Sequence, residues 1–200
     1  LGLYRLGRNQ APSRVFGVEY PGCPAESFPP LRAPLAYRGG LPKPPTRFFG
    51  REGERELIRD ALADDDTRLV TLTGPAGSGK TRLAIEVARE LRDAVNGAVG
   101  SVQLQDVSDR AGILRALGSA AGKPRSPGMD PIDHLLDAVA DQPTLLVVDN
   151  AEHVLDDAAE IIRCLLERAP TLTCLVTSRR RLQLSGETEF RVPPLPVPTR

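Results

Sequence analysis

The stretch Gly74-Pro75-Ala76-Gly77-Ser78-Gly79-Lys80-Thr81 constrains the fold more than any other part of the chain. It has the pattern G-x-x-x-x-G-K-[ST], follows an apolar segment at 69–73 and opens a helical pattern at 79–93, which is the setting of a phosphate-binding loop. Its glycines let backbone N–H groups converge on phosphate oxygens, and the helix N-terminus adds partial positive charge. We therefore predict binding of ATP or a close relative, with Lys80 at the β- and γ-phosphates and Thr81 as a Mg²⁺ ligand. The predicted nucleotide-binding set comprises these residues and the adjacent Arg82.

Apolar and amphipathic segments alternate along residues 46–198. Strands are predicted at 69–73, 98–104, 144–149, 172–177 and 188–192, and helices at 54–63, 79–93, 109–120, 130–140 and 153–168. Apolar strands that alternate with helices form a parallel sheet covered on both faces. With the phosphate-binding loop, this pattern predicts an α/β P-loop NTPase fold with three α/β/α layers.

The front of the chain has a different composition. Residues 21–45 are rich in proline and are expected to form an extended linker. Residues 1–20 are expected to be the remnant of a preceding domain, with short strands at 4–6 and 14–20. We expect a fragment of a longer protein, in which the NTPase domain of 46–198 is followed by further domains.

The charge and cysteine content narrow the expected partners. Lys plus Arg and Asp plus Glu both number 26, so the neutral balance gives no reason to expect direct nucleic-acid binding. The three cysteines are scattered, which argues against a disulfide framework and fits a reducing cytoplasm. No apolar stretch approaches the roughly 20 residues that span a bilayer, so no membrane partner is expected.

An acidic residue ends the most apolar predicted strand. Asp149 follows Thr144-Leu145-Leu146-Val147-Val148 and matches the Walker B carboxylate that binds Mg²⁺ through water. The next residue is Asn150, where hydrolytic enzymes of this type usually have a carboxylate, and an amide is a poor proton acceptor. Glu152 either substitutes as the carboxylate that polarises the attacking water or serves as a first-turn acid of the following helix.

Two further segments are candidate nucleotide contacts. Arg179 follows the predicted strand 172–177, where ligands of parallel sheets bind, and it either contacts the γ-phosphate or belongs with Arg180 and Arg181 to a solvated basic turn. Phe49, Gly50 and Arg51 precede the first predicted helix. The aromatic pair of Phe48 and Phe49 covers a purine ring, forms a hydrophobic staple at the helix start, or does both.

These motifs together resemble the STAND-class signalling NTPases, specifically the NB-ARC-like ATPase modules of large bacterial LuxR- and SARP-type regulators and of cyclase–ATPase fusions. The resemblance covers residues 46–198 and includes Phe49 to Glu52, residues 69–83, residues 146–153, Thr177 to Arg179, and Gly186-Glu187. It implies ATP as the nucleotide and an AAA-related sheet in which the strand ending at Thr177 lies between the loop strand and the Asp149 strand. Arg179 would then lie beside Lys80 as a γ-phosphate sensor. The family commonly has Cys where this chain has Ala151, a conservative change for packing.

A second resemblance concerns the front of the chain. A resemblance to the tail and exit linker of a class III adenylate or guanylate cyclase domain is carried by Leu1-Gly2, Tyr4-Arg5-Leu6, Arg14-Val15-Phe16 and Phe28-Pro29-Pro30-Leu31-Arg32. The metal-binding acids of a cyclase are absent from so short a stretch. The resemblance implies that the parent protein makes a cyclic nucleotide and that this fragment does not.

The predicted function is a nucleotide-dependent switch in signal transduction and transcriptional regulation. ATP with Mg²⁺ holds Arg179 and the flanking domain in one arrangement, and slow hydrolysis or exchange releases it, with Asn150 as the reason for slow turnover. The expected partners are the nucleotide, other domains of the same polypeptide, and further copies of the chain on activation. The catalytic candidates are Lys80, Asp149, Asn150, Glu152 and Arg179, and the metal ligands are Thr81 and Asp149.

Two other functions remain open at this stage. One is an enzyme with steady turnover. It is either an ATPase motor, in which Arg180 or Arg181 reaches the nucleotide site of a neighbouring subunit, or a kinase-like phosphotransferase. For the phosphotransferase the sequence offers no acceptor pocket with its own base. The other is a scaffold with a decayed site, against which the intact Lys80, Thr81 and Asp149 argue.

Overall fold

The phosphate-binding motif connects strand β3 (Leu69–Thr73) to helix α2 (Lys80–Ala94), as the sequence predicts. The computed structural model describes residues 2–4, 13–15, 41–43, 46–94, 98–121, 128–140 and 143–195. Its other elements are β1 (Gly2–Tyr4), β2 (Ser13–Val15), α1 (Glu52–Ala63), β4 (Ala98–Gln103), α3 (Arg110–Ala121), α4 (Pro131–Val139), β5 (Thr144–Asp149), the 3-10 turn η2 (Ala151–His153), α5 (Leu155–Arg168), β6 (Leu172–Ser178) and β7 (Glu187–Arg191).

The main sheet has five strands in the order β4-β5-β6-β3-β7, and every neighbouring pair is parallel. The strand that contains Thr177 therefore lies between the loop strand β3 and the Asp149 strand β5, which confirms the predicted order. Because the carboxyl ends of parallel strands meet at one edge, Thr73, Asp149 and Ser178 end neighbouring strands beside the phosphate-binding loop.

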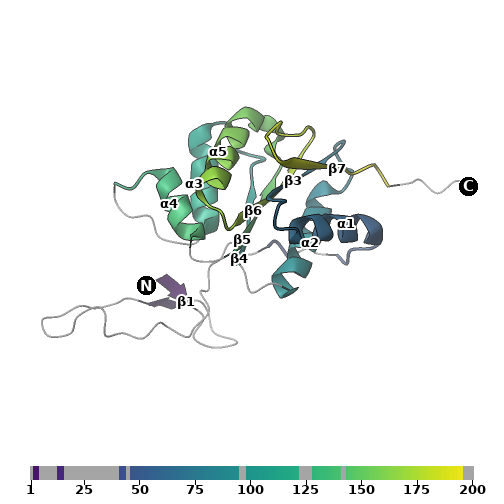
Figure 1. Ribbon diagram of the computed structural model, residues 1–200, viewed down its shortest axis with the longest axis horizontal. Helices are drawn as coiled ribbons and strands as arrows, with labels where there is room; N and C mark the ends of the chain where they lie inside the picture. Colours follow the sequence, from purple (N-terminus) through teal and green to yellow (C-terminus); the bar gives the residue numbers. More distant parts are fainter. Residues whose placement is uncertain are drawn as a thin grey trace, which may run out of the picture.

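Helices cover both faces of this sheet (Figure 1). Helices α1 and α2 pack on one face around Ile58, Leu83 and Val87, which are all fully buried. Helices α3, α4 and α5 pack on the other face around Ile113 and Ile161. The three-layer P-loop NTPase fold predicted from the alternating pattern is confirmed. No helix among the described residues is long and apolar enough to cross a membrane.

The predicted helix starts are wrong at two places for the same physical reason. Helix α1 begins at Glu52 rather than 54, after Arg51 in the left-handed region with φ 61°. Helix α5 begins at Leu155 rather than 153, because Asn150, with φ 60°, turns the chain into the separate 3-10 turn η2 first. Positive φ is uncommon outside glycine, so local propensity does not reveal such turns.

Part of the expected linker packs on the NTPase fold. Leu41 is buried against the α1–α2 core, and Arg89 of α2 donates a 2.7 Å hydrogen bond to the carbonyl oxygen of Pro42. In the front segment, β1 and β2 pair antiparallel, and they overlap the predicted strands at Tyr4 and at Arg14 and Val15. The remainder of the expected linker and of the cyclase-like tail lies outside the described residues.

Candidate nucleotide and magnesium site

The phosphate-binding loop has the backbone that its glycines predict. Gly77 and Gly79 have φ angles of 76° and 88°, in the region that side chains disfavour. Gly74 has a φ angle of 147° and is needed for a second reason as well, since a Cβ there would lie 2.4 Å from the carbonyl oxygen of Val192. The segment that leaves β7 therefore packs directly on the start of the loop, and Val192 N–H also donates to the carbonyl oxygen of Thr73 at 2.7 Å.

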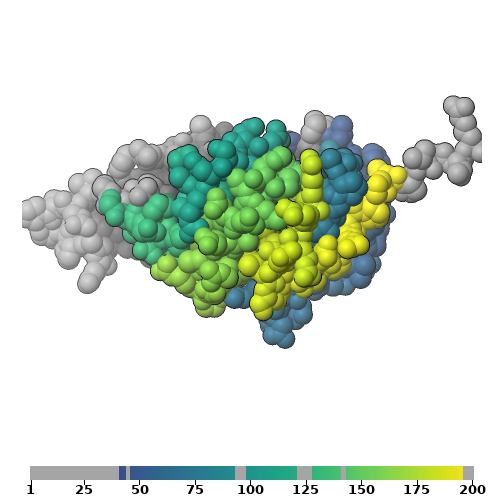
Figure 2. Space-filling view, turned by 90° about the horizontal axis from the view of Figure 1, so that it is seen from above, coloured from purple at the N-terminus to yellow at the C-terminus, as the bar shows by residue number. Residues whose placement is uncertain are grey.

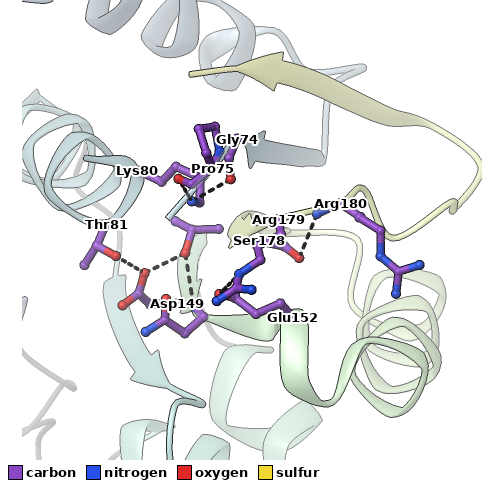
Figure 3. A network of polar contacts seen from close by, with 11 residues as sticks. Gly74, Pro75, Lys80, Thr81, Asp149, Glu152, Ser178, Arg179 and Arg180 are labelled. Carbon is purple, nitrogen blue, oxygen red and sulfur yellow. Dashed lines mark hydrogen bonds and ion pairs between the residues drawn. The ribbon is translucent and has the colours of Figure 1, made fainter. Parts of the chain in front are cut away.

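Lys80 lies at the inner side of this loop. Its side chain folds back so that Nζ donates to the carbonyl oxygens of Gly74 (2.9 Å) and Pro75 (3.0 Å), and the residue is 7% exposed (Figure 3). Ser78 Oγ is buried beside it and has no hydrogen-bond partner among the described residues. A buried ammonium group and an unpaired hydroxyl at a helix N-terminus are donors that suit phosphate oxygens.

Two threonines hold the carboxylate of Asp149. Thr81 Oγ1 from α2 and Thr177 Oγ1 from β6 each donate a 2.6 Å hydrogen bond to Asp149 Oδ1, and the residue is 4% exposed. Thr177 Oγ1 also accepts the backbone N–H of Asn150 at 3.0 Å. The predicted metal ligands, Thr81 and Asp149, are thus in direct contact. Their hard oxygen atoms fit Mg²⁺, which commonly takes one or two protein ligands together with phosphate oxygens.

Glu152 and Arg179 form an ion pair at the edge of the site. The turn at Asn150 and η2 directs Glu152 toward the end of β6, where its Oε1 lies 3.4 Å from Arg179 Nε (Figure 3). The side chain of Glu152 is 15% exposed and that of Arg179 is 58% exposed. Glu152 Oε2 is buried and has no hydrogen-bond partner in the described part of the chain. The expectation that Arg179 contacts the γ-phosphate beside Lys80 stays a prediction, and its partner in this structure is Glu152.

The two aromatic residues before α1 lie in different environments, since Phe49 is exposed and Phe48 packs on the core. Phe49 is 76% exposed, with the Arg47 guanidinium 5.4 Å from its ring centroid. Phe48 packs against the α1–α2 core, with Arg55 5.8 Å from its ring centroid. Gly50 precedes the cap of α1, so the strict staple from that position is not formed. Phe48 supplies an apolar contact near the helix start instead. Purine contact by Phe49 stays a prediction.

Arg51 and Arg82 have structural partners. Arg51 Nη2 donates to the carbonyl oxygens of Ser78 (2.9 Å) and Pro193 (2.7 Å), and its side chain is 7% exposed. It therefore ties the phosphate-binding loop to the segment that leaves β7. Arg82 donates through both terminal nitrogens to Thr46, at 3.0 Å to Oγ1 and 2.9 Å to the carbonyl oxygen. Direct nucleotide binding by Arg51 and Arg82 stays a prediction.

Sequence reasoning missed what Thr177 and Glu187 do, although both lie in motifs that it noted. Thr177 supplies a fully buried hydroxyl near the end of β6, and its place beside the apolar pair Leu175-Val176 was the available signal. Glu187 accepts the backbone N–H groups of Leu182 (2.7 Å), Gln183 (2.7 Å) and Leu184 (3.4 Å), which shapes the loop that follows Arg179. No sequence pattern indicated that role.

Comparison with known proteins identifies the family to which the residues of this site belong. The model of the AAA ATPase domain matches residues 47–177. An uncharacterized protein of Mycobacterium tuberculosis is 37% identical over 189 residues, which cover 94% of this chain and 47% of that protein. This relative and two others match most of the present chain, but the chain spans only about half of the length of each of them.

A second relative and a solved structure extend the comparison. A protein of M. tuberculosis described as an HTH-type transcriptional regulator is 39% identical over 142 residues, which cover 70% of this chain and 15% of that protein. The Aeropyrum pernix ORC2 protein, solved in ADPNP–ADP complexes, superposes with a TM-score of 0.58 at 17% identity, over 74% of this chain and 48% of that one. The structural likeness agrees with the fold described above.

Proposed function

This chain belongs to the AAA ATPase domain family, and from that membership we propose that it is the ATP-binding switch module of a multidomain bacterial regulator of the STAND class. In this proposal it binds ATP with Mg²⁺, hydrolyses it slowly, and passes the state of the nucleotide to the other domains and to further copies of the chain. Its 39% identity to a protein described as an HTH-type transcriptional regulator supports a role in regulation.

The contact between Thr81 and Asp149 is the observation on which the proposal rests. A helix residue and a strand residue 68 positions apart in the chain are brought to 2.6 Å, immediately next to Lys80. Thr81 and Asp149 would hold Mg²⁺, which neutralises charge on the β- and γ-phosphates when bound. Lys80 would move its ammonium group from the loop carbonyls to the phosphate oxygens, and the loop N–H groups would surround them.

The environment of Asp149 also supports slow hydrolysis. A water oxygen must bond to the γ-phosphorus while the bond to the bridging oxygen breaks, and the water must lose a proton. Asn150, the residue after Asp149, is a poor acceptor for that proton. Glu152 is an acceptor, but it is paired with Arg179. We therefore expect turnover well below the 1–100 s⁻¹ typical of kinases.

Titration with ATP and ADP, with and without Mg²⁺, tests the binding part of the proposal. Isothermal calorimetry should show ATP binding that Mg²⁺ strengthens. Lys80→Ala should weaken it about 10- to 100-fold, as expected for loss of a charge-assisted contact. Asp149→Asn should remove most of the effect of Mg²⁺. Asp156→Asn, an exposed acid in the first turn of α5, is the matched control and should change neither. ATP affinity that is unaltered by Lys80→Ala would contradict the proposal.

A turnover ATPase is the second candidate, and Glu152 Oε2 favours it because this buried oxygen has no hydrogen-bond partner among the described residues. In that case Glu152 acts as the general base. Rapid steady hydrolysis by the wild type that Glu152→Gln abolishes would support this candidate over the slow switch. Slow hydrolysis that Glu152→Gln leaves unchanged would exclude it.

A further inference from the structure

One face of the β3–β7 pair is polar, in contrast to the rest of the sheet. Residues paired in parallel register lie on the same face, and Val70, Leu72 and Phe190 pack on the α1–α2 side. The opposite face therefore carries the pairs Thr71–Glu189 and Thr73–Arg191. Parallel strands covered on both sides are normally apolar throughout. This polar face indicates a place where the sheet meets something other than a helix.

The connection from β6 to β7 crosses that face without forming a helix. Residues 179–186 run over it, with Leu182 buried in the α5-side core and Glu187 accepting the backbone N–H groups of the loop. In Figure 2 the last described part of the chain, in yellow, lies on the surface beside green residues of the preceding part. Beneath the crossing lies a cleft of about 790 Å³.

Arginine side chains dominate this cleft. Arg179 to Arg181 and Arg191 line it, and Glu189 is the carboxylate among its lining residues. Glu189 is already engaged, since it accepts a 2.6 Å hydrogen bond from Thr73 Oγ1 and lies 3.7 Å from Arg191 Nε. The exposed side chains of Arg180 and Arg181 form no ion pair with any described residue. The cleft therefore has an excess of positive charge.

The inner end of the cleft adjoins the nucleotide site. Gly74 and Pro75, whose carbonyl oxygens accept hydrogen bonds from Lys80, line the cleft together with Arg179. Its outer part is formed by Arg180 and Arg181, and Figure 3 shows the side chain of Arg180 pointing away from Lys80 and Asp149. The cleft thus extends from the start of the phosphate-binding loop to the surface.

We infer that this cleft is a binding site for inorganic phosphate, and that it holds the phosphate released by hydrolysis before it reaches solvent. The claim that the phosphate comes from ATP hydrolysis rests on the proposed ATPase function, whereas the claim that the cleft binds phosphate does not. Guanidinium groups match the geometry of phosphate oxygens and keep their charge at any physiological pH. A nucleic-acid backbone fits less well, because it requires a continuous basic surface and the chain has a formal net charge of 0.

Phosphate binding in the absence of nucleotide tests the site directly. Because the phosphate-binding loop can itself bind phosphate, the experiment uses the Lys80→Ala chain as the background and inorganic phosphate as the probe, followed by calorimetry. Arg180→Ala with Arg181→Ala in that background should weaken phosphate binding about tenfold or more. The control pair Arg110→Ala with Arg163→Ala, which removes exposed arginines of α3 and α5, should leave it unchanged. Undetectable phosphate binding, or equal affinity in both double variants, would overturn the inference.

Release kinetics identify the source of the phosphate. In a single turnover of the otherwise unmodified chain, appearance of free phosphate should lag behind ATP cleavage, and the Arg180→Ala/Arg181→Ala variant should shorten that lag. Arginine-dependent phosphate binding without a lag would mean that the site takes phosphate from solution. If ATP fails to bind while arginine-dependent phosphate binding persists, the proposed function fails and the site stands. If ATP binds and phosphate does not, only the site fails.

Discussion

Thr177 Oγ1 donates a 2.6 Å hydrogen bond to Asp149 Oδ1 while it accepts the backbone N–H of Asn150 at 3.0 Å. One buried hydroxyl on β6 therefore orients both the metal-binding carboxylate of β5 and the peptide that follows it. Its neighbour at the carboxylate, Thr81, would also be a metal ligand. Thr177 is not a predicted metal ligand, so its hydroxyl can keep its hydrogen bond to Asp149 both with and without bound Mg²⁺.

Thr177→Val should reduce the strengthening of ATP binding by Mg²⁺ about tenfold, because Asp149 loses a donor and the Asn150 N–H loses its acceptor. Thr177→Ser should restore most of the effect, since it keeps the hydroxyl. Thr71→Val is the matched control on the adjacent strand. Thr71 Oγ1 is buried without a hydrogen-bond partner among the described residues, so this change should leave Mg²⁺ dependence unaltered and should not destabilise the fold. Calorimetric titration of ATP at several Mg²⁺ concentrations measures the effect, and equal behaviour of the two valine variants would contradict it.

Arg51→Lys should lower the free energy of unfolding by roughly 1–3 kcal/mol. The ammonium nitrogen of lysine lies one bond closer to the backbone than Arg51 Nη2, so it does not reach both carbonyl oxygens that Nη2 bridges. The bridge joins Ser78 of the loop to Pro193 after β7, 142 residues from Arg51 in the chain. Urea denaturation measures the loss.

Arg59→Ala on helix α1, which Arg51 precedes, is the control for Arg51→Lys. Its ion pairs are longer, at 3.7 to 4.0 Å, and its side chain is 41% exposed, so it should cost less than about 1 kcal/mol. The role assigned to Arg51 is wrong if both variants unfold at the same urea concentration.

The elements that could be predicted from sequence are those specified by local pattern. Strands 69–73 and 144–149 have the predicted bounds because each is a short run of β-favouring residues that ends at a residue of the site. The phosphate-binding loop and Asp149 were predicted because their chemistry depends on residue type and spacing. The strand order followed from a family resemblance, since no local property distinguishes which parallel strands are neighbours.

What the sequence did not reveal depends on tertiary contacts between distant residues. The Arg51 bridge, the pairing of Glu152 with Arg179, and the cap that Glu187 provides each require the positions of groups that only folding brings together. Arg51 adopts a left-handed conformation against local preference, and Asn150 adopts one that asparagine tolerates better than most residues. Neither could be predicted from propensity, and they account for the two misplaced helix starts.

Glu187→Ala should loosen the loop that carries Arg179 to Arg181. The carboxylate accepts backbone N–H groups from Leu182, Gln183 and Leu184, and its loss leaves these donors unpaired at a cost of roughly 1–3 kcal/mol. Trypsin should then cleave after Arg179, Arg180 or Arg181 faster than in the wild type, which mass spectrometry of the fragments identifies. Glu160→Ala, which removes an exposed ion pair with Arg110, is the control and should leave the cleavage rate unchanged. Unchanged cleavage in Glu187→Ala would show that the loop is held by other contacts.

Stability should fall as pH rises above about 9, because of Cys174. Burial raises the pKa of this fully buried thiol to about 12 from its ordinary value of 9.0, and the positive charge of Arg68 opposes the shift. Above pH 9.0 the unfolded chain loses the thiol proton while the folded chain keeps it, so the unfolded state binds fewer protons and is favoured progressively until about pH 12. The measurement is urea denaturation from pH 8 to 10.5, a range that keeps the arginines charged. Cys174→Ala should have a flatter pH dependence than the wild type, whereas Cys164→Ala, which leaves the buried thiol of Cys174 in place, should keep the wild-type slope. Parallel slopes in wild type and Cys174→Ala would rule out a contribution from the buried thiol.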